Sequence, residues 1–421
     1  MVRPFRRPRR QPPRTLLSPH GINRKECRIS GKIDILNLSI GRGHPFYLDG
    51  IISALIRRGA VSLLKGQVEV FDICSGLSRA GWHTARWLYH HGASNPIVGA
   101  LYHLIRRQND YNKPSVSLRI LGRPLIDTFG PGSDPLIVSH PMLVGILANR
   151  PNLLYQHGEL VAPDESLVRG ASVVFVPTHD VAERFLSAGY SRGQILVTGL
   201  CIEPPLTRTA EDMYLSRINR LQSTDELCGL FVSSGAEPSD HINALVTSAL
   251  SALKSGGKAV ILVREGGKLE YRITSALHSE GILPAIVNSA TPIPTELPQA
   301  TIVSFTTRRE ENNLTECLFR HLDYFVSPAH ERINWAMGLG LPMFVLTPSI
   351  GPFAPLNLEL VKSAGVGRII GDQIPPSDFG PTLERLRRSG ELSAMAERGW
   401  QERPIDGFQR IADYLITHFQ P

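Results

Sequence analysis

An apolar strand pattern, a glycine-containing turn and a helical pattern follow one another near the start of the chain. The strand pattern covers residues 32–40, the turn 41–45 has the sequence Gly-Arg-Gly-His-Pro, and residues 46–59 carry apolar side chains at helical spacing. Proline suits the first turn of a helix, because the N–H that it lacks would have no partner there. This unit therefore places His44 at the carboxyl end of a first parallel strand, where open α/β sheets bind ligands.

The turn itself suits a bound ligand. Gly41 and Gly43 allow the backbone to approach a ligand closely, and the N-terminus of a helix favours negative charge. His44 ionises near neutral pH, which makes it the candidate general base of an enzyme. The alternative is that its imidazole caps the helix or positions a substrate.

The positive charge of the chain is concentrated at its N-terminal end. The 421 residues have a net charge of +7, and residues 1–32 hold ten of the 45 basic side chains but one of the 38 acidic ones. The remaining residues therefore carry 35 basic and 37 acidic side chains, which argues against a nucleic-acid-binding globule. Residues 1–30 are rich in proline and arginine, so we expect a disordered tail there. It either attaches to anionic lipid or is a solvated leader.

The sequence predicts no signal peptide, membrane span, metal site or cofactor. The tail lacks the apolar run of a signal peptide, and no apolar stretch reaches the ~18 residues that a membrane span needs. The five cysteines are scattered without metal-site spacing. Cys201, Cys228 and Cys317 lie in or beside apolar segments, and we interpret them as small core residues in a reducing compartment.

Strand patterns alternate with helical patterns along both halves of the chain, which predicts parallel sheets with helical crossovers. The expected strands are residues 32–40, 68–72, 136–139, 153–156, 173–177 and 195–198 in the first half, and 229–233, 259–263, 301–305, 324–327 and 343–347 in the second. We expect a disordered basic tail over 1–30, an N-terminal Rossmann-like domain over 31–203, a polar linker over 204–224, a C-terminal Rossmann-like domain over 225–403 and a C-terminal helix over 404–421.

Several short motifs occur in an order that resembles one known group of enzymes. They are Ser39-Ile-Gly-Arg-Gly-His44, Leu154-Tyr-Gln-His-Gly-Glu-Leu160, and the segments 173–189, 195–204, 230–236, 340–348 and 357–365. Together they resemble the two-domain glycosyltransferases of the GT-B fold, and the nearest groups are the monogalactosyldiacylglycerol synthases and the peptidoglycan N-acetylglucosaminyltransferase. The resemblance implies two Rossmann-like parallel-sheet domains that face a cleft. It also implies inverting, metal-independent hexosyl transfer from a nucleotide sugar.

The resemblance places the donor, a uridine or other nucleoside diphosphate sugar, in the C-terminal half. Backbone N–H groups of the loops 234–236 and 329–331 would hold the diphosphate, although both could be ordinary turns. The residues expected on the donor side are Ser234, Gly235, Ala236, Arg264, Phe305, Ala329, His330, Asn334 and Asn357. One departure is visible: the ribose-binding glutamate of these families is expected near Asn334, whereas the nearest glutamate is Glu331.

The acceptor side is expected around the first turn and the loop after residues 153–156. His157 and Glu159 could line it together with Gly41 and Gly43, although a loop histidine without function is the slightly favoured alternative for His157. Residues 80–107 mix aromatic and basic side chains, which suits a helix that dips into a leaflet. A pair of core helices is the other interpretation of this stretch, which contains two tryptophans.

These observations predict a glycosyltransferase at the cytosolic membrane face. It would move a sugar from a nucleotide sugar to a lipid-linked acceptor and bind an anionic membrane surface, but no nucleic acid. Two alternatives remain open. One is a nucleotide-sugar epimerase or hydrolase of the same fold, which would need several carboxylates at the cleft. The other is a non-catalytic GT-B-like binding protein.

Overall fold

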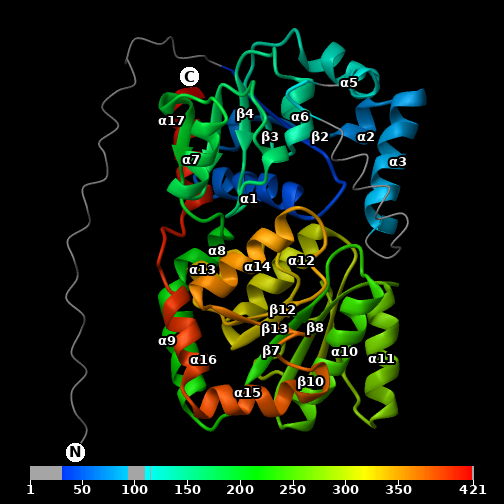
Figure 1. The fold of residues 1–421 in the computed structure, drawn as a ribbon, viewed down its shortest axis with the longest axis vertical. Coiled ribbons are helices and arrows are strands. Elements are labelled where there is room, and N and C mark those ends of the chain that lie inside the picture. Colours follow the sequence, from blue (N-terminus) through cyan, green and yellow to red (C-terminus); the bar gives the residue numbers. More distant parts are fainter. Residues whose placement is uncertain (1–30, 93–109, 114, 420–421) are drawn as a thin grey trace, which may run out of the picture.

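The computed structural model describes residues 31–92, 110–113 and 115–419, in two α/β domains stacked along the longest axis of the molecule (Figure 1). The predictions for the tail 1–30 and for residues 93–107 lie outside these residues. Every pairing among the described strands is parallel. The structure thus confirms the predicted fold class of two parallel-sheet domains.

The N-terminal sheet has six strands in the order β2-β1-β3-β4-β5-β6. Its strands are β1 (Ile33–Asn37), β2 (Leu64–Glu69), β3 (Leu136–Val138), β4 (Leu153–Gln156), β5 (Val173–Val176) and β6 (Ile195–Val197). The helices of this domain are α1 (Gly43–Arg57), α2 (Val70–Ile73), α3 (Gly76–Gly92), α5 (Val116–Phe129), α6 (Pro141–Ile146) and α7 (His179–Ser187).

The C-terminal sheet has seven strands in the order β13-β12-β11-β7-β8-β10-β9. Its strands are β7 (Cys228–Val232), β8 (Lys258–Arg264), β9 (Ala285–Val287), β10 (Ala300–Phe305), β11 (Tyr324–Ser327), β12 (Met343–Leu346) and β13 (Gly367–Ile370). Its helices are α10 (Ser239–Lys254), α11 (Lys268–Ser279), α12 (Arg308–Leu318), α13 (Ile333–Gly338), α14 (Phe353–Ala364), α15 (Phe379–Arg388) and α16 (Glu391–Gly399).

Helices cover both faces of each sheet, and this explains the apolar strand patterns in the sequence. All five residues of β1 are buried. Ile35 packs into one apolar cluster and Leu36 into another, because successive side chains of a strand point to opposite faces. A strand that is buried on both faces carries no polar–apolar alternation. The two buried polar residues of β1 are paired, since Asp34 Oδ2 lies 3.1 Å from Lys65 Nζ and Asn37 donates to Glu69.

The predicted strand over 68–72 is wrong in its position. The strand β2 ends at Glu69, and Val70 begins the short helix α2. Val70 and Phe71 are buried there as helical residues. A short apolar run has no periodicity that separates a buried strand from a buried helical turn, so the sequence could not distinguish them.

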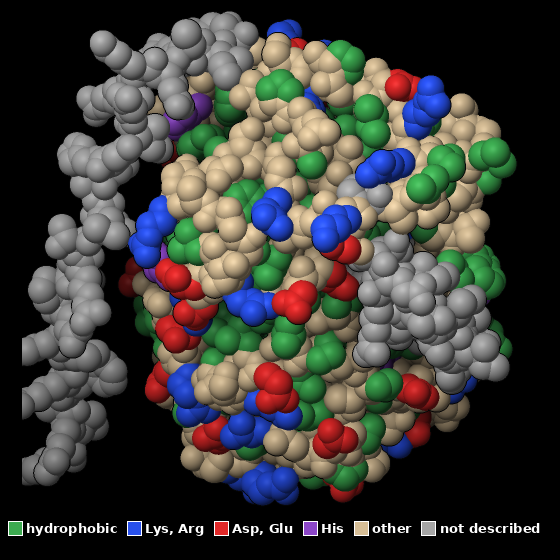
Figure 2. All heavy atoms as spheres, turned by 45° about the horizontal axis from the view of Figure 1, so that its top comes forward, with side chains coloured by type: hydrophobic (Ala, Val, Ile, Leu, Met, Phe, Trp, Pro, Cys, Tyr) green, Lys and Arg blue, Asp and Glu red, His purple; other side chains and the backbone are tan. Residues whose placement is uncertain are grey.

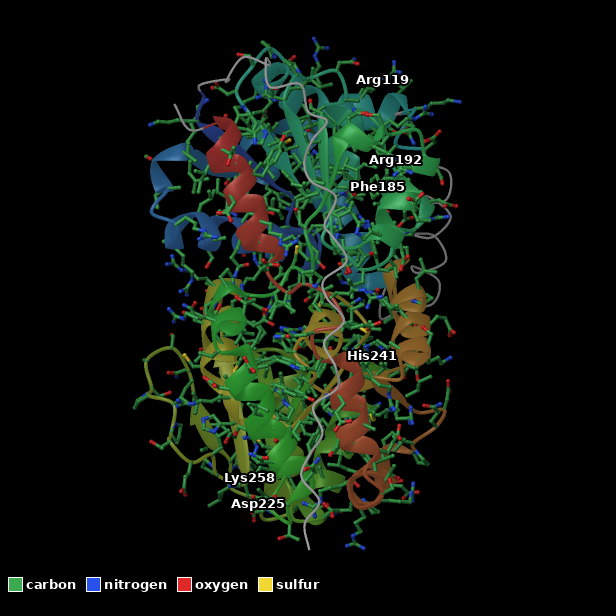
Figure 3. The ribbon with its side chains drawn as sticks, turned by 90° about the vertical axis from the view of Figure 1, so that its left-hand side faces the viewer. Arg119, Phe185, Arg192, Asp225, His241 and Lys258 are labelled. Atoms are coloured by element: carbon green, nitrogen blue, oxygen red, sulfur yellow. The ribbon has the colours of Figure 1, made fainter. Side chains whose placement is uncertain are left out.

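The chain crosses between the domains twice. The segment predicted as a linker forms two helices, α8 (Pro204–Arg208) and α9 (Ala210–Gln222), and the buried Arg217 of α9 donates to the carbonyls of Leu322 and Leu339 in the C-terminal domain. The last helix, α17 (Gly407–Phe419), returns to the N-terminal domain, where Figure 3 shows it in red beside the blue elements. A Cβ at Gly50 of α1 would lie 2.2 Å from the Phe408 ring, so glycine allows α17 to pack closely.

Two predicted side-chain environments need correction. Trp82 is 0% exposed, and its indole donates to the Leu121 carbonyl (3.2 Å), so it joins α3 to α5 and cannot enter a leaflet. Cys317 is exposed, whereas Cys201 and Cys228 are buried as predicted. No helix within the described ranges is both long and apolar enough to cross a membrane.

Candidate active site

The turn after β1 lies at the carboxyl edge of the N-terminal sheet and faces the C-terminal domain. The carbonyl of His44 accepts a hydrogen bond from Ser139 Oγ (2.8 Å), which ties the first turn of α1 to the end of β3. The His44 ring lies 4.5 Å from the ring of His140, centroid to centroid. Nδ1 of His140 accepts from the Met142 N–H and so caps α6. Two imidazoles therefore lie side by side where β1 and β3 end.

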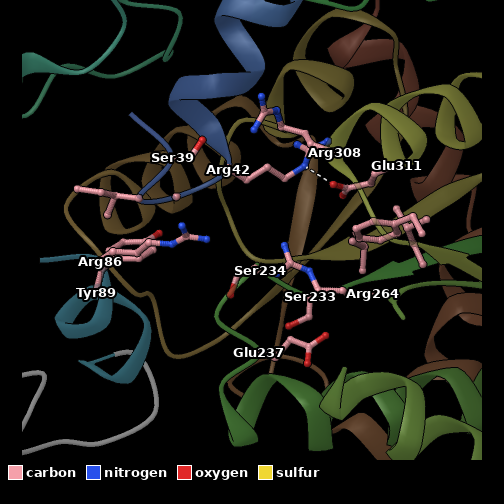
Figure 4. A pocket seen from close by; sticks show the side chains of 16 residues that line it. Ser39, Arg42, Arg86, Tyr89, Ser233, Ser234, Glu237, Arg264, Arg308 and Glu311 are labelled. Carbon is pink, nitrogen blue, oxygen red and sulfur yellow. Dashed lines mark hydrogen bonds and ion pairs between the residues drawn. The ribbon is translucent and has the colours of Figure 1, made fainter. Parts of the chain in front are cut away.

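Two adjoining pockets lie between the domains at this turn. The first, which we call the cleft pocket, has a volume of about 240 Å³ and is shown in Figure 4. The second, the histidine pocket, has a volume of about 110 Å³ and contains His44, His140, Glu159, His330, Glu331 and Phe353 in its lining. Gly41, Arg42, Tyr89, Ser234 and Gly235 line both pockets, so the two form one continuous cleft.

The structure brings most of the predicted donor-side residues to this cleft. Ser234 and Gly235 follow β7, Arg264 ends β8 and Phe305 ends β10, so all four lie at the carboxyl edge of the C-terminal sheet. This is the edge at which parallel α/β sheets bind ligands. His330 reaches the histidine pocket from the loop after β11.

Gly235 lies in open space rather than in a strained turn. A Cβ built there meets no atom within 4 Å, and its φ is outside the left-handed region; the residue with positive φ in this loop is Glu237 (φ 44°). A side chain at position 235 is therefore compatible with the fold. It would interfere only with a ligand that approaches the backbone at this position.

Four of the predicted donor-side residues, Ala236, Ala329, Asn334 and Asn357, do not line the cleft. Asn357 is buried and donates to the carbonyl of Ala329 (3.1 Å), so the pair holds the loop after β11 against α14. Asn334 is buried and donates to the Cys201 carbonyl (3.4 Å), which joins α13 to the segment before α8. Within the segment where the ribose-binding glutamate was expected, Glu331 carries the carboxylate that reaches the cleft.

A buried ion cluster, which the sequence analysis missed, joins the domains across the cleft. Arg42 Nε lies 2.9 Å from Glu311 Oε2, Arg42 Nη2 donates to Asn312 Oδ1 (2.9 Å), and Arg42 also pairs with Glu331. Arg332 pairs with Glu311 and lies 3.9 Å from Glu331. The cluster holds two positive and two negative side chains. Its only sequence signal was an arginine within the 41–44 turn, because Arg42 and Glu311 are 269 positions apart.

The arginines of this cluster stabilise the ionised form of its carboxylates. Burial by itself would raise the pKa of Glu331, but Arg42 and Arg332 outweigh burial and lower it to about 2. The same two arginines lower the pKa of Glu311 against its burial. Both carboxylates are therefore ionised at neutral pH, and the cluster is electrically balanced. Arg308 and Asp49 form a second ion pair between the domains (Nη2 to Oδ1, 3.2 Å).

Glu159 differs from Glu311 and Glu331 in its protonation state. It is 8% exposed, it lines the histidine pocket, and its Oε2 atom has no hydrogen-bond partner among the described residues. Burial, followed by the nearby charge of Glu331, raises the pKa of Glu159 to about 8. A Cβ at Gly43 would lie 3.3 Å from Glu159 Oε1, so glycine lets the turn approach this carboxyl group. At neutral pH Glu159 is thus a protonated acid beside His44, able to donate a hydrogen bond.

His157 does not reach the cleft. It is 3% exposed, its Nε2 lies 3.1 Å from the Val161 carbonyl, and its ring packs against Phe185. Burial lowers the pKa of His157 to about 3, so it stays neutral. The structure therefore places His157 in the core beneath the histidine pocket, as the alternative interpretation of a loop histidine allowed.

Comparison with protein-family models gives no match, and comparison with curated proteins gives none either. Solved structures do match over nearly the whole chain. A proposed UDP-N-acetylglucosamine 2-epimerase from Listeria monocytogenes is 14% identical, with a TM-score of 0.55 over 93% of this chain and 97% of its own. MnaA from S. aureus, solved with UDP, is 11% identical (TM-score 0.52; 92% and 96%). The calicheamicin glycosyltransferase CalG4 is 14% identical (TM-score 0.51; 92% and 98%).

The chain has the GT-B fold. The matches include a glycosyltransferase and a proposed epimerase of similar TM-score, so the likeness does not separate these two activities for this molecule. In this GT-B structure, the cleft between the sheets coincides with the continuous pair of pockets around Arg42. The chemistry of that cleft, rather than the fold, has to decide the function.

Proposed function

We propose that this protein is a glycosyltransferase that moves a sugar from a nucleoside diphosphate sugar to a lipid-linked acceptor at the cytosolic membrane face. The observation that carries the proposal is the position of His44. It lies at one end of a continuous cleft whose other walls are the loop at Ser234 and Gly235 and the guanidinium of Arg264. CalG4, which shares the fold, is a glycosyltransferase.

Each requirement of sugar transfer has a candidate group in the cleft. His44 would take the proton from the acceptor hydroxyl as that oxygen attacks the sugar carbon. The leaving nucleoside diphosphate would be stabilised by the backbone N–H groups at Ser234 and Gly235 and by Arg264, which can pair bidentately with phosphate. Phe305 would contact the base. Glu331 lies one helical turn before the position expected for the ribose-binding glutamate. It pairs with Arg42, so its carboxylate would become available to ribose once Arg42 moves away.

The protonated Glu159 supports a second candidate function. An epimerase or hydrolase of nucleotide sugars needs acid–base groups at the sugar itself, and Glu159 and His44 line the same pocket. Such an enzyme would change or hydrolyse a nucleotide sugar without any acceptor. Incubation of the protein with UDP-sugars alone therefore separates the two functions, because a transferase needs an added acceptor to turn over.

The donor site predicts the effect of a side chain at position 235. In the full-length protein, Gly235→Val should weaken UDP binding by roughly 10-fold or more, because valine would clash with a ligand that approaches the backbone. The free energy of unfolding without ligand should stay unchanged, since a Cβ there meets no atom. Calorimetric titration with UDP and chemical denaturation measure the two quantities.

Gly193 offers a matched control for this variant. It is exposed, a Cβ there also meets no atom within 4 Å, and it lies outside both pockets. Gly193→Val should bind UDP as the wild type does. Equal UDP affinities in the Gly235 variant and the wild type would place the donor elsewhere. Failure of the wild type to bind any nucleoside diphosphate would favour a non-catalytic binding protein.

The proposed membrane contact is supported by one face of the N-terminal domain. Its exposed apolar side chains are Leu77 (86% exposed), Val116 (73%) and Ile120 (58%) on α3 and α5. The exposed Arg79, Arg119 and Arg123 lie on the same two helices, and Figure 2 shows basic and apolar side chains together at the upper right, over α3 and α5. Apolar side chains with basic neighbours suit an anionic membrane interface. We call this surface the α3–α5 face.

The α3–α5 face predicts which apolar residues matter for membrane binding. The double variant Leu77→Ser/Ile120→Ser should lower the partition of the protein onto anionic vesicles by about 10-fold or more, because each buried leucine-sized side chain contributes about 1.5–3 kcal/mol. The control Leu283→Ser/Ile286→Ser removes equally exposed apolar side chains from the C-terminal domain (85% and 54% exposed) and should have no effect. Co-sedimentation measures both. If the wild type fails to sediment with anionic vesicles at low salt, the proposed lipid acceptor loses its support.

A further inference from the structure

An open groove extends from the cleft along α3, and the proposed mechanism uses none of the α3 side chains that line it. It has a volume of about 670 Å³ and is lined by His83, Thr84, Arg86, Trp87 and His91 of α3 and by Gly235 and Arg264 of the C-terminal domain. We call it the α3 groove. Arg86, Gly235 and Arg264 line both this groove and the cleft pocket, so the two spaces are continuous.

The described residues that line the groove include two arginines and no carboxylate. Within the described part of the chain, neither Arg86 nor Arg264 forms an ion pair. Figure 4 shows both guanidinium groups pointing into the space between the domains, Arg86 from α3 and Arg264 from the end of β8. The adjoining cleft pocket is lined by two carboxylates: Glu311, which pairs with Arg42 and Arg332, and Glu237, which accepts from the Lys268 N–H (2.8 Å).

Two aromatic contacts shape the groove. The Arg86 guanidinium lies 5.5 Å from the centroid of the Phe71 ring, which holds its stem against the domain. Trp87 is 50% exposed and stacks on His91 with 4.4 Å between ring centroids. The half-exposed indole and the Arg86 guanidinium, which line the same groove, offer a flat apolar surface and a site for a doubly charged oxyanion.

The groove also has a fixed position relative to His44. Tyr89, two residues before His91 on the same helix, lies against the 41–44 turn: a Cβ at Gly41 would be 3.1 Å from its hydroxyl oxygen. A molecule in the groove that extends past Tyr89 therefore enters the histidine pocket, which Tyr89 also lines. The groove thus leads from solvent toward the candidate base.

We infer that the α3 groove binds the acceptor through a phosphate group held by Arg86, with the adjoining ring or chain on Trp87 and with Arg264 left to the donor diphosphate. This rests on the proposed function and names its acceptor class: a phosphorylated molecule whose free hydroxyl reaches His44. Arginine pairs with phosphate bidentately, and Arg86, which has no ion pair with the described residues, gives up none when it does so. The same phosphate chemistry occurs in a soluble sugar phosphate and in a lipid headgroup.

The test titrates the full-length protein with two phosphate sources, with and without saturating UDP. Hexose 6-phosphate is the soluble probe, and phosphatidylcholine vesicles containing phosphatidylglycerol are the lipid probe. Tryptophan fluorescence is the readout, and Trp87→Phe identifies the part that comes from Trp87. At least one probe should change this signal in a saturable way. Arg86→Gln should raise the apparent dissociation constant about 10-fold or more, while the affinity for UDP stays the same.

Arg192→Gln is the matched control, because Arg192 is an exposed arginine of the same domain that lines none of the three spaces. It should leave both titrations unchanged. Three results would overturn the inference: neither probe changes the Trp87 signal, both arginine variants weaken the probe equally, or Arg86→Gln weakens UDP instead. If the protein binds a phosphate probe but not UDP, the result would support the phosphate site in the α3 groove and would rule out the proposed donor site.

Discussion

Replacing His44 by alanine should lower the turnover of sugar transfer by at least about 100-fold, the usual loss when a general base is removed. The free energy of unfolding and the affinity for UDP should change little, because the donor-side walls of the cleft come from the other domain. Steady-state transfer from a UDP-sugar, chemical denaturation and calorimetry measure the three quantities. A variant with near-normal turnover would remove His44 from the mechanism.

Two further variants define what His44 does. His44→Gln keeps a hydrogen-bonding side chain but cannot take a proton, so it should be as inactive as the alanine variant; recovery of activity would show a positioning imidazole instead. His179→Ala is the matched control, because His179 is an exposed histidine in the first turn of α7 and lines neither pocket. It should leave turnover unchanged.

The same assay without an acceptor tests the second candidate function, because it detects epimerised or hydrolysed sugar.

Removing Glu311 should destabilise the folded protein by about 3–5 kcal/mol, because Glu311→Ala leaves Arg42 and Arg332 buried with a single carboxylate between them. Urea denaturation measures the loss. The control is Glu359→Ala, which breaks the exposed pair with Lys362 (2.9 Å) and should cost less than about 1 kcal/mol. Equal losses in the two variants would mean that the buried cluster does not hold the domains together.

A compensating variant separates lost charge balance from lost packing. Glu311→Met/Arg332→Met removes one charge of each sign and leaves Arg42 paired with Glu331. It should recover much of the stability lost in Glu311→Ala, because replacing a buried ion pair by apolar side chains is often close to neutral. A double variant as unstable as the single one would show that the geometry of the cluster matters more than its charge.

The same cluster sets a pH dependence whose sign follows from Glu331. Its pKa in the folded protein is about 2, which is below the ordinary value of 4.5. A depressed carboxyl pKa contributes stability that is fully present above the unfolded value and is lost as the pH falls through the folded one. The wild type should therefore lose this contribution between about pH 4.5 and pH 2.

The sequence by itself determined the features that depend on local pattern. The apolar strands, the helical spacing after them and the glycine turn at His44 are each encoded within about 20 neighbouring residues, because strand and helix periodicities are local. The alternation of these patterns was enough to predict two parallel sheets, and the structure confirms them. The position of the loop at Ser234 and Gly235 was also predictable, since this loop directly follows a predicted strand and so lies at the carboxyl edge of the sheet.

The tertiary structure decided everything that depends on which distant residues meet. Trp82 and Trp87 lie five positions apart, yet one is fully buried and the other half exposed, because only Trp82 faces α5. The pairing of Arg42 with Glu311 exists only once the two domains meet at one cleft. Burial sets the charge of a side chain, and burial is a property of the whole fold.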